Sequence, residues 1–144
     1  MDQAQKRYFR QKRDIYIGTV YLKPYKNNND NSKKNLDLFE EIFSFQEKGE
    51  VIVQGDFNAR TNVDDDTIAV DKYDDTFMIP TENLPQNIQS RISEDRVASD
   101  HRGKELLELC KSLGLIILNG RKVGDIFGKY TSFQWNGCSV VDYV

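Results

Sequence analysis

Residues 51–60, VIVQGDFNAR, restrict the fold of this chain more than any other segment. A short run of β-branched residues is typical of a strand buried in a sheet core. The run ends at Gly55, and Asp56 and Asn58 follow at the end of the strand, where ligands of α/β proteins tend to bind. A carboxylate can accept a proton from water, and an amide both donates and accepts hydrogen bonds. The pattern predicts either a polar site at a sheet edge or an Asx turn that closes the strand.

Two segments before this run have the periodicity of regular structure. Residues 15–22 alternate apolar and polar positions and are followed by Pro24, which predicts a strand. The next apolar residues recur at helical spacing: Leu36, Phe39, Ile42 and Phe43. A strand, a helix and a strand in this order predict a layered α/β domain with a sheet core.

Periodic patterns return in the last third of the chain. One helical face is predicted from four residues: Leu106, Leu109, Cys110 and Leu113. Gly114 provides a left-handed stop, and the apolar run LIIL at residues 115–118 predicts a further buried strand, closed by a turn at Asn119-Gly120. The segments KYTSFQW and CSVVDYV flank Asn136-Gly137, and this dipeptide predicts the turn of a β-hairpin.

Residues 61–98 carry nine acids against three basic residues and have no clear periodicity. The run DDD at residues 64–66 lacks the spacing and central glycine of an EF-hand, so we expect an acidic, solvated loop region and no calcium site. Residues 1–34 have the opposite balance, with nine Lys or Arg against three acids. The basic arm at residues 1–13 is either a phosphate-binding segment or a solvated lead into the first strand.

The composition predicts one globular domain spanning residues 1–144, because 38% of the residues are hydrophobic and 30% are charged. No apolar run approaches the ~20 residues of a membrane span, and the N-terminus lacks the apolar region of a signal peptide. Cys110 lies on the predicted apolar helix face, where a buried, reduced thiol fits an intracellular protein, either nuclear or cytoplasmic. The sequence indicates no oligomeric state.

The segment GDFNAR resembles the Gly-Asp-Phe-Asn motif of the endonuclease/exonuclease/phosphatase superfamily, which is also called DNase I-like. The segments IYIGTVYLKP and GKELLELCKSLGLIILNGRKVGDIFGKYTSFQWNGCSVVDYV are similar to its non-LTR retrotransposon (LINE-type) endonuclease domains, in the same order. This resemblance covers the chain from about residue 14 to residue 144. It implies a partial α-β-β-α sandwich, with mixed or antiparallel sheets flanked by helices.

The resemblance implies four catalytic residues. Asp56 would orient or deprotonate the attacking water, and Asn58 would bind the scissile phosphate and help fix Asp56. Tyr21 matches a tyrosine that reaches the phosphate, and Asp142 matches an aspartate that orients a catalytic histidine. Taken alone, Tyr21 also fits an ordinary strand aromatic. The resemblance also implies hydroxyl groups near the phosphate, at Thr131 and Ser139. A structural role in the hairpin fits these two residues equally well.

The chemistry that the resemblance implies is metal-assisted phosphodiester hydrolysis of DNA, with Mg²⁺, or Mn²⁺ in its place, as the cofactor. Two features of the family are not matched. Residues 1–13 contain no counterpart of its metal-binding glutamate, so the metal ligands are unknown. The histidine of its Ser-Asp-His motif is also missing, because the letters SDH at residues 99–101 precede a helix and read as a cap and first turn. We therefore expect His101 to be solvent-exposed.

These gaps suggest a domain truncated at both ends, with weak or no activity as this chain. Two alternatives stay open. One is a non-catalytic remnant that binds nucleic acid through five residues of the basic arm: Lys6, Arg7, Arg10, Lys12 and Arg13. The other is a phosphoesterase that acts on lipid headgroups or small phosphodiesters.

Overall fold

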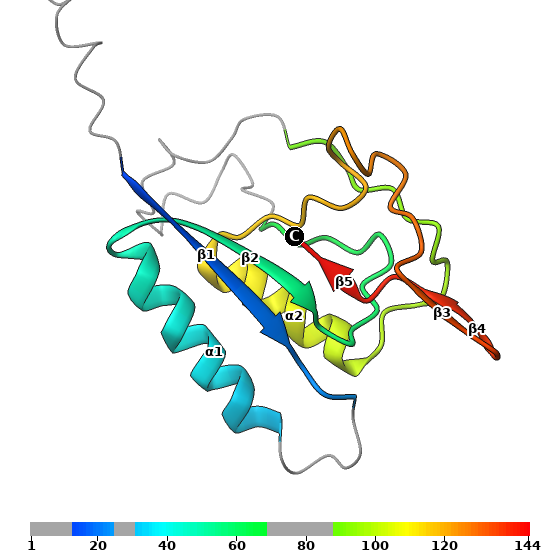
Figure 1. Cartoon of the computed structure of the whole chain (residues 1–144), viewed down its shortest axis with the longest axis horizontal. Helices are drawn as coiled ribbons and strands as arrows, with labels where there is room; N and C mark the ends of the chain where they lie inside the picture. Colours follow the sequence, from blue (N-terminus) through cyan, green and yellow to red (C-terminus); the bar gives the residue numbers. More distant parts are fainter. Residues whose placement is uncertain (1–12, 25–30, 69–87) are drawn as a thin grey trace, which may run out of the picture.

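The chain folds into a mixed three-stranded sheet with two helices packed on one of its faces, and a separate two-stranded hairpin (Figure 1). This computed structural model describes residues 13–24, 31–68 and 88–144, and the side chains of residues 31–36 are left aside. The elements within these ranges are β1 (Asp14–Tyr21), α1 (Asn31–Gln46), β2 (Gly49–Asp56), α2 (His101–Leu113), β3 (Ser132–Gln134), β4 (Gly137–Ser139) and β5 (Asp142–Tyr143). The predicted α/β class is confirmed. No helix within the described ranges is long and apolar enough to cross a membrane.

The first three elements form a β-α-β unit, as the sequence predicts. β1 and β2 are parallel neighbours in register from Asp14 opposite Gly49 to Tyr21 opposite Asp56. α1 connects them and packs on the sheet, where the rings of Tyr16 and Phe45 lie 5.1 Å apart. The alternation of exposed and less exposed residues along both strands leaves their other face open to solvent.

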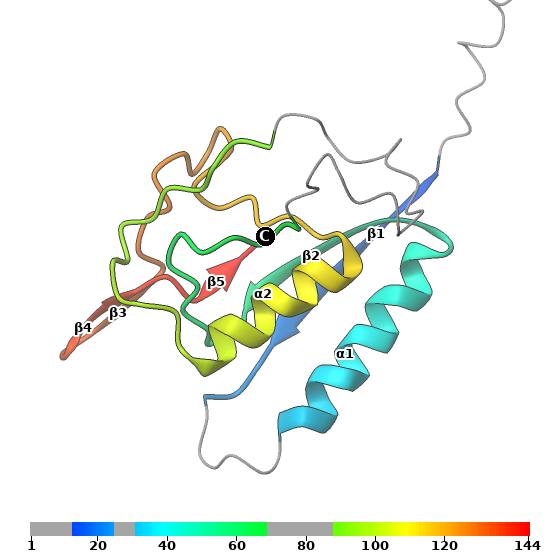
Figure 2. The ribbon, with the colours of Figure 1, turned by 180° about the vertical axis from the view of Figure 1, so that it is seen from behind.

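α2 lies beside α1 and completes the cover of the same sheet face, as the view from behind shows (Figure 2). Its buried residues pack against residues from the strand ends in one core cluster: Phe57, Ala59, Leu106, Leu107, Cys110, Ile117, Val140 and Tyr143. Cys110 is buried, as predicted, and burial raises the pKa of its thiol to about 12. Burial of these apolar side chains is the main stabilising contribution to the helix–sheet contact.

The start of α2 settles the role of the SDH letters. Asp100 is the N-cap, and its carboxylate accepts a hydrogen bond of 2.6 Å from the Gly103 N–H. His101 is the first helical residue and is exposed, with Nδ1 3.4 Å from a carboxylate oxygen of Glu105. The predicted helix start is therefore confirmed, and Gly114 ends the helix with a φ of 65°, as expected.

Two predictions in the last third of the chain are wrong in detail. Residues 115–118 do not form a strand. The Leu118 N–H donates to the Val144 carbonyl after β5, but the Ile117 N–H donates to the carboxylate of Asp66 at 2.8 Å and the Leu115 N–H to the Cys110 carbonyl of α2. The hairpin does form, but Gln134 lies opposite Gly137, so its two-residue loop is Trp135-Asn136. The chain then leaves the hairpin, and β5 joins the main sheet antiparallel to β2.

The expected solvated loop region is wrong for two of its acids. Asp66 is fully buried, and its two carboxylate oxygens accept hydrogen bonds from Arg121 at 2.6 and 2.8 Å. Asp95 is also buried, and it accepts from the backbone N–H groups of Val97 and Val140. The described part of residues 61–98 has no helix or strand, and these polar contacts hold it against the domain. The sequence could not show the contacts with Arg121 and Val140, because these partners lie 55 and 45 positions away along the chain. Residues 69–87 of this region lie outside the described ranges.

We predict that Gly18→Ala stabilises the protein. A Cβ at this position would meet its nearest heavy atom, the Ile52 carbonyl oxygen, at 4.0 Å, and Gly18 borders a cavity of about 220 Å³ under α1. Replacing a strand glycine that has room for a methyl group should raise the free energy of unfolding by about 0.5–1 kcal/mol. Urea denaturation measures this change.

Gly55→Ala is the matched control, with the opposite expected sign. Gly55 has a φ of +138°, and a Cβ there would lie 2.0 Å from the Val20 carbonyl oxygen. The substitution should lower the free energy of unfolding by about 1–3 kcal/mol or more. Equal effects of the two substitutions would show that the cavity beside Gly18 does not accept the methyl group.

We also predict that Asp66→Ala destabilises the fold strongly, because it leaves the buried Arg121 guanidinium without its counter-charge. The expected loss is about 3–5 kcal/mol in urea denaturation at neutral pH. Asp65→Ala changes an exposed acid next to it and should stay within about 0.5 kcal/mol of the parent protein. Similar losses in the two variants would contradict a structural role specific to Asp66.

The same ion pair predicts a dependence of stability on pH. Burial alone raises the pKa of Asp66, but hydrogen bonds from Arg121 and the Ile117 N–H and the charges of Arg121 and Arg91 outweigh it, so the pKa is lowered. A carboxylate with a lowered folded-state pKa stabilises the protein above its unfolded-state pKa of about 4, and this contribution disappears as the pH falls further. Urea denaturation from neutral pH to below pH ~4 should therefore show a steeper acid loss for the parent protein than for Asp66→Asn.

Candidate functional site

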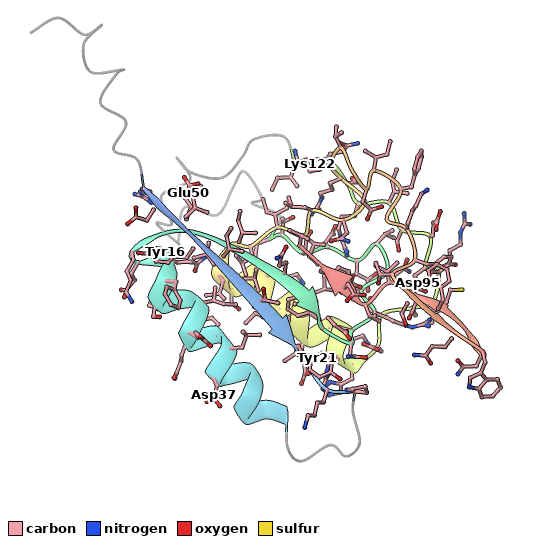
Figure 3. The ribbon with its side chains drawn as sticks, viewed as in Figure 1. Tyr16, Tyr21, Asp37, Glu50, Asp95 and Lys122 are labelled. Carbon is pink, nitrogen blue, oxygen red and sulfur yellow. The ribbon has the colours of Figure 1, made fainter. Side chains whose placement is uncertain are left out.

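Three of the four predicted catalytic residues form one row across the end of the main sheet. Tyr21 at the end of β1 lies opposite Asp56 at the end of β2. Asp56 in turn lies opposite Asp142 at the start of β5. Residues directly opposite each other on neighbouring strands present their side chains on the same face. We call these three residues the terminal row. It lies on the open face of the sheet, and Figure 3 shows Tyr21 at the tip of β1.

Asn58, the fourth predicted residue, is fixed next to the terminal row by local hydrogen bonds. Its backbone N–H donates to Asp56 Oδ1 at 2.8 Å, which is the Asx turn expected from the sequence as an alternative to a site. Its side-chain Nδ2 donates to the Leu22 carbonyl at 2.8 Å. A φ of 47° at Asn58 places it in the left-handed region, which asparagine tolerates better than most residues. The Asx turn and a polar site at the end of β2 can therefore coexist, because the turn holds Asn58 next to the terminal row.

The side chains of the terminal row are not equally exposed to solvent. Tyr21 is exposed, whereas Asp56 and Asp142 are half-buried. The two carboxylates can accept hydrogen bonds or a proton from water, and the tyrosine hydroxyl can both donate and accept. Within the described ranges, no group of three or more His, Cys, Asp or Glu side chains is arranged to hold a metal ion. The carboxylates of the terminal row therefore do not form a complete metal site by themselves.

Asn119 holds the strand that carries Asp142, and the sequence indicated only a turn at this position. Its Nδ2 donates to the Asp142 carbonyl at 3.2 Å, and its Oδ1 accepts from the Val144 N–H at 2.9 Å. The side-chain amide thus pairs with β5 as a neighbouring strand would. Asp125 lies 3.4 Å from the same Nδ2 and also accepts from the Lys129 N–H. An Asn-Gly dipeptide reads as a turn, and nothing in its spacing predicted this pairing.

Thr131 supports Asp142 from the other side. Its Oγ1 accepts hydrogen bonds from the backbone N–H groups of Val141 and Asp142, at 3.1 and 3.2 Å. Its own backbone N–H donates to the Ser139 carbonyl within the hairpin. Both residues hold the backbone here, in line with the structural alternative that the sequence left open for Thr131 and Ser139.

Tyr143 anchors β5 from the helix side of the sheet. Its hydroxyl donates to the carbonyl of Ala59 or Val140, 3.0 and 2.8 Å away, and accepts from the N–H and hydroxyl of Thr61. Burial raises the pKa of Tyr143 more than the hydrogen bonds from Thr61 lower it, so the hydroxyl stays protonated as a donor. This anchor fixes the position of β5 next to β2.

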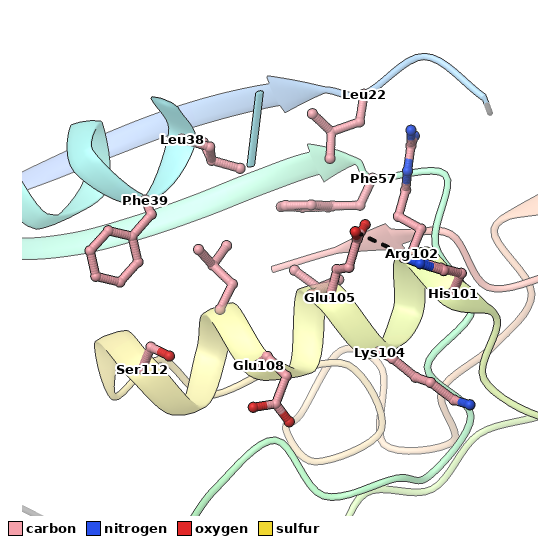
Figure 4. Close-up of a pocket in the computed structure, with 12 residues that line it drawn as sticks. Leu22, Leu38, Phe39, Phe57, His101, Arg102, Lys104, Glu105, Glu108 and Ser112 are labelled. Carbon is pink, nitrogen blue, oxygen red and sulfur yellow. Dashed lines mark ion pairs between the residues drawn. The ribbon is translucent and has the colours of Figure 1, made fainter. Parts of the chain in front are cut away.

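The other face of the sheet carries a groove of about 540 Å³ between α1 and α2 (Figure 4). Apolar side chains that include Leu38, Phe39 and Phe57 line it, and His101 lies at its rim together with Arg102. The buried Arg102 guanidinium donates to the Lys23 carbonyl. His101 is therefore on the helix side of the sheet, and the structure does not bring it to the terminal row.

Comparisons of this chain with protein-family models, with curated proteins and with solved structures gave no match.

We predict that Asn119→Ala loosens β5. The substitution leaves the Asp142 carbonyl and the Val144 N–H without their side-chain partner, so the free energy of unfolding should fall by about 1–3 kcal/mol. Amide hydrogen exchange at Val144 should become faster in the same variant. Asn136→Ala alters an exposed asparagine in the hairpin loop and serves as the control, with an expected change within about 0.5 kcal/mol. Unchanged exchange at Val144 in Asn119→Ala would contradict the role of this amide.

Proposed function

We propose that this chain is a phosphodiesterase domain of the endonuclease/exonuclease/phosphatase type that acts on DNA, most similar to the endonucleases of non-LTR retrotransposons. The observation that carries the proposal is the terminal row. Tyr21, Asp56 and Asp142 come from strands far apart in the sequence, yet they are direct neighbours in the sheet, and Asn58 is fixed next to them. Each matches a residue that the resemblance assigns to catalysis.

The proposed reaction begins with a water molecule held by Asp56. Its Oδ1 already accepts the Asn58 N–H, which orients the carboxylate and leaves Oδ2 to accept a hydrogen bond from the water. The water attacks the phosphorus of the phosphodiester, and its proton passes to the carboxylate of Asp56. The bond between the phosphorus and the leaving sugar oxygen breaks, and this oxygen takes up a proton from solvent and leaves as an alcohol. Tyr21 is exposed at the edge of the row and donates a hydrogen bond to a phosphate oxygen.

Asn58 has a more limited role in this proposal than the resemblance implies. One N–H of its side-chain amide is used by the Leu22 carbonyl. The second N–H remains available to donate to a phosphate oxygen, because an amide nitrogen carries two hydrogens. The bond to Leu22 holds the amide in place, so this donor is pre-oriented for the phosphate.

The described residues of the terminal row do not complete a site for a metal ion. The resemblance implies Mg²⁺, which prefers carboxylate, water and phosphate oxygens and would neutralise charge on the phosphate. The described residues supply Asp56 and Asp142, but no third acidic ligand lies with them. The glutamate that the resemblance requires also has no counterpart in the sequence. The residues present do not fit a complete site for the ion, and no step above depends on it.

The two-sheet architecture is part of the same proposal. The open face of the β1–β2 pair exposes three isoleucines at one end, and polar residues that include Thr19 and Gln54 follow toward the other end. An apolar sheet face is typical of a sheet that packs against a second one, as in an α-β-β-α sandwich. The exposed face therefore supports the sandwich architecture, although the described elements form only one such sheet.

We predict weak or undetectable nicking of supercoiled plasmid by the chain with Mg²⁺, and faster nicking when imidazole is added. Asp142 has no histidine to orient, because the one histidine of the chain lies at the helix side of the sheet. Free imidazole has a pKa near neutrality and can protonate the leaving oxygen, a role that none of the residues above fills. We expect imidazole to raise the nicking rate severalfold, and Asp56→Asn to abolish the increase.

Three controls separate this site from others. EDTA tests the need for a metal ion, and His101→Ala should leave the rate unchanged because His101 is not at the terminal row. Asp65→Asn, which alters an exposed acid elsewhere, should also have no effect. Nicking that survives both Asp56→Asn and Asp142→Asn would place the activity elsewhere and refute the proposed site. Turnover of a soluble phosphodiester without any DNA nicking would favour a small-substrate phosphoesterase.

Non-catalytic DNA binding is the second candidate, and the unmatched glutamate and histidine favour it. This candidate depends on five residues of the basic arm. Arg13 is exposed next to β1, and the other four lie outside the described ranges: Lys6, Arg7, Arg10 and Lys12. Binding that falls steeply with salt, survives Asp56→Asn and is lost on charge reversal of the basic arm would support this candidate. Absence of binding to DNA would refute it.

A further inference from the structure

The chain contains two Asn-Gly dipeptides, Asn119-Gly120 and Asn136-Gly137, and the structure holds them very differently. This dipeptide is chemically labile. Glycine has no Cβ, so the backbone nitrogen after the asparagine can approach the carbon of its side-chain amide and displace ammonia. The rate of this reaction in a folded protein depends on how firmly the structure holds the side-chain amide and the backbone N–H.

Both reacting groups of Asn119-Gly120 are held by hydrogen bonds. The Asn119 Oδ1 accepts from the Val144 N–H, and its Nδ2 donates to the Asp142 carbonyl. The Gly120 N–H, whose nitrogen would have to attack, donates to the Asp125 carbonyl at 2.7 Å. Gly120 is also buried. A reaction at this dipeptide therefore requires local unfolding.

Asn136-Gly137 lies at the tip of the hairpin, and both of its residues are exposed. Within the described ranges, the Asn136 side chain has no hydrogen-bond partner. A Cβ on Gly137 would meet no heavy atom within 4 Å apart from those of its chain neighbours. The Asn136 amide is therefore free to turn toward the backbone that follows it.

The hairpin that carries this dipeptide can open by itself. β3 and β4 have three residues each and form a sheet of their own, which projects from the domain (Figure 1). An isolated two-stranded hairpin is only marginally stable in water. Gly137 pairs with Gln134 at the end of the hairpin, next to the loop. Opening of this pair makes the Gly137 nitrogen available without unfolding of the main sheet.

We propose that Asn136 is a site of spontaneous deamidation and that the fold protects Asn119 from the same reaction. The Gly137 nitrogen forms a bond to Cγ of Asn136, and the bond between Cγ and Nδ2 breaks. Nδ2 takes up the proton from the Gly137 nitrogen and leaves as ammonia, so a five-membered succinimide ring remains. Water then opens the ring: its hydroxyl group adds to one of the two carbonyl carbons, the bond from that carbon to the ring nitrogen breaks, and the nitrogen takes the proton. The product is aspartate or isoaspartate at position 136.

Both products change the surface of the hairpin. Each adds a negative charge next to Trp135, which is 98% exposed. Isoaspartate also routes the backbone through the side-chain carbon, which lengthens the loop and disturbs the pairing of Gln134 with Gly137. The reaction involves no residue of the terminal row, so it does not depend on the proposed function.

Incubation of the whole folded chain in mildly alkaline buffer, followed by peptide mass spectrometry, tests the proposal. Trypsin cleaves after Lys and Arg and places the two asparagines in separate peptides, residues 112–121 and 130–144, so Asn119 is an internal control. We expect Asn136 to be converted at least about tenfold faster than Asn119, because Asn119 must first lose several hydrogen bonds. A sample digested without incubation measures the conversion that digestion itself causes.

The same incubation in concentrated urea separates the effect of the fold from that of the local sequence. Unfolding removes the hydrogen bonds of Asn119, so its conversion should become at least about tenfold faster and approach that of Asn136. Asn136→Gln is the chemical control. Its longer side chain would have to form a less favourable six-membered ring, so the peptide of residues 130–144 should stay unmodified. Circular dichroism checks that the samples without urea are folded.

Equal conversion of the two asparagines in the folded protein would overturn the proposal, and so would faster conversion of Asn119. A preference for Asn136 that urea leaves unchanged would also overturn it, because the local sequence and not the fold would then protect Asn119. Conversion of Asn136 that occurs only in urea would show that the hairpin does not open as proposed. Each of these outcomes is independent of nuclease activity.

Discussion

The irregular half of this domain depends on one buried ion pair. The carboxylate of Asp66 accepts two hydrogen bonds from Arg121 and a third from the Ile117 N–H. Arg121 also donates to the carbonyl groups of Ile117 and Gln89, so three separated stretches of chain meet at one pair of charges. A segment without strands has no hydrogen bonds to a neighbouring strand for its backbone groups. Here the charged side chains form hydrogen bonds with these groups instead. The cost of burying two charges is offset only because almost every donor and acceptor has a partner.

The predictable part of the fold is the part with local periodicity. The alternation in β1, the helical spacing in α2 and the cap at Asp100 each result from neighbouring residues, so the sequence indicates them directly. The LIIL run failed as a strand because apolarity says that a segment is buried but not which group its N–H will meet. Ile117 meets Asp66, 51 positions away. The DDD run shows the same limit, since three identical letters include exposed Asp64 and Asp65 and fully buried Asp66.

The site shows the same division between local and distant information. The sequence placed Asp56 and Asn58 at the end of a strand, and the turn between them is a local feature. The sequence connects Tyr21 and Asp142 with Asp56 through the resemblance, because no spacing rule does so. For the side chains that hold the site in place, the sequence predicts a turn at Asn119, and at Thr131 either a hydroxyl near the phosphate or a hairpin position. Positioning residues are hard to find in a sequence when they act on backbone atoms of a distant strand.

The pairing of β2 with β5 has a consequence for the order in which the chain acquires its structure. β1, α1 and β2 are close together in the sequence, whereas the Tyr143 hydroxyl reaches the Ala59 carbonyl across 84 positions. Contacts of such long range form late, since the entropy of closing the intervening loop must be met first. During synthesis on the ribosome, the β-α-β unit is complete while β5 has yet to be made. The carboxylate of Asp142 therefore reaches Asp56 only when the rest of the domain has folded. A nascent chain that lacks β5 does not have a complete terminal row.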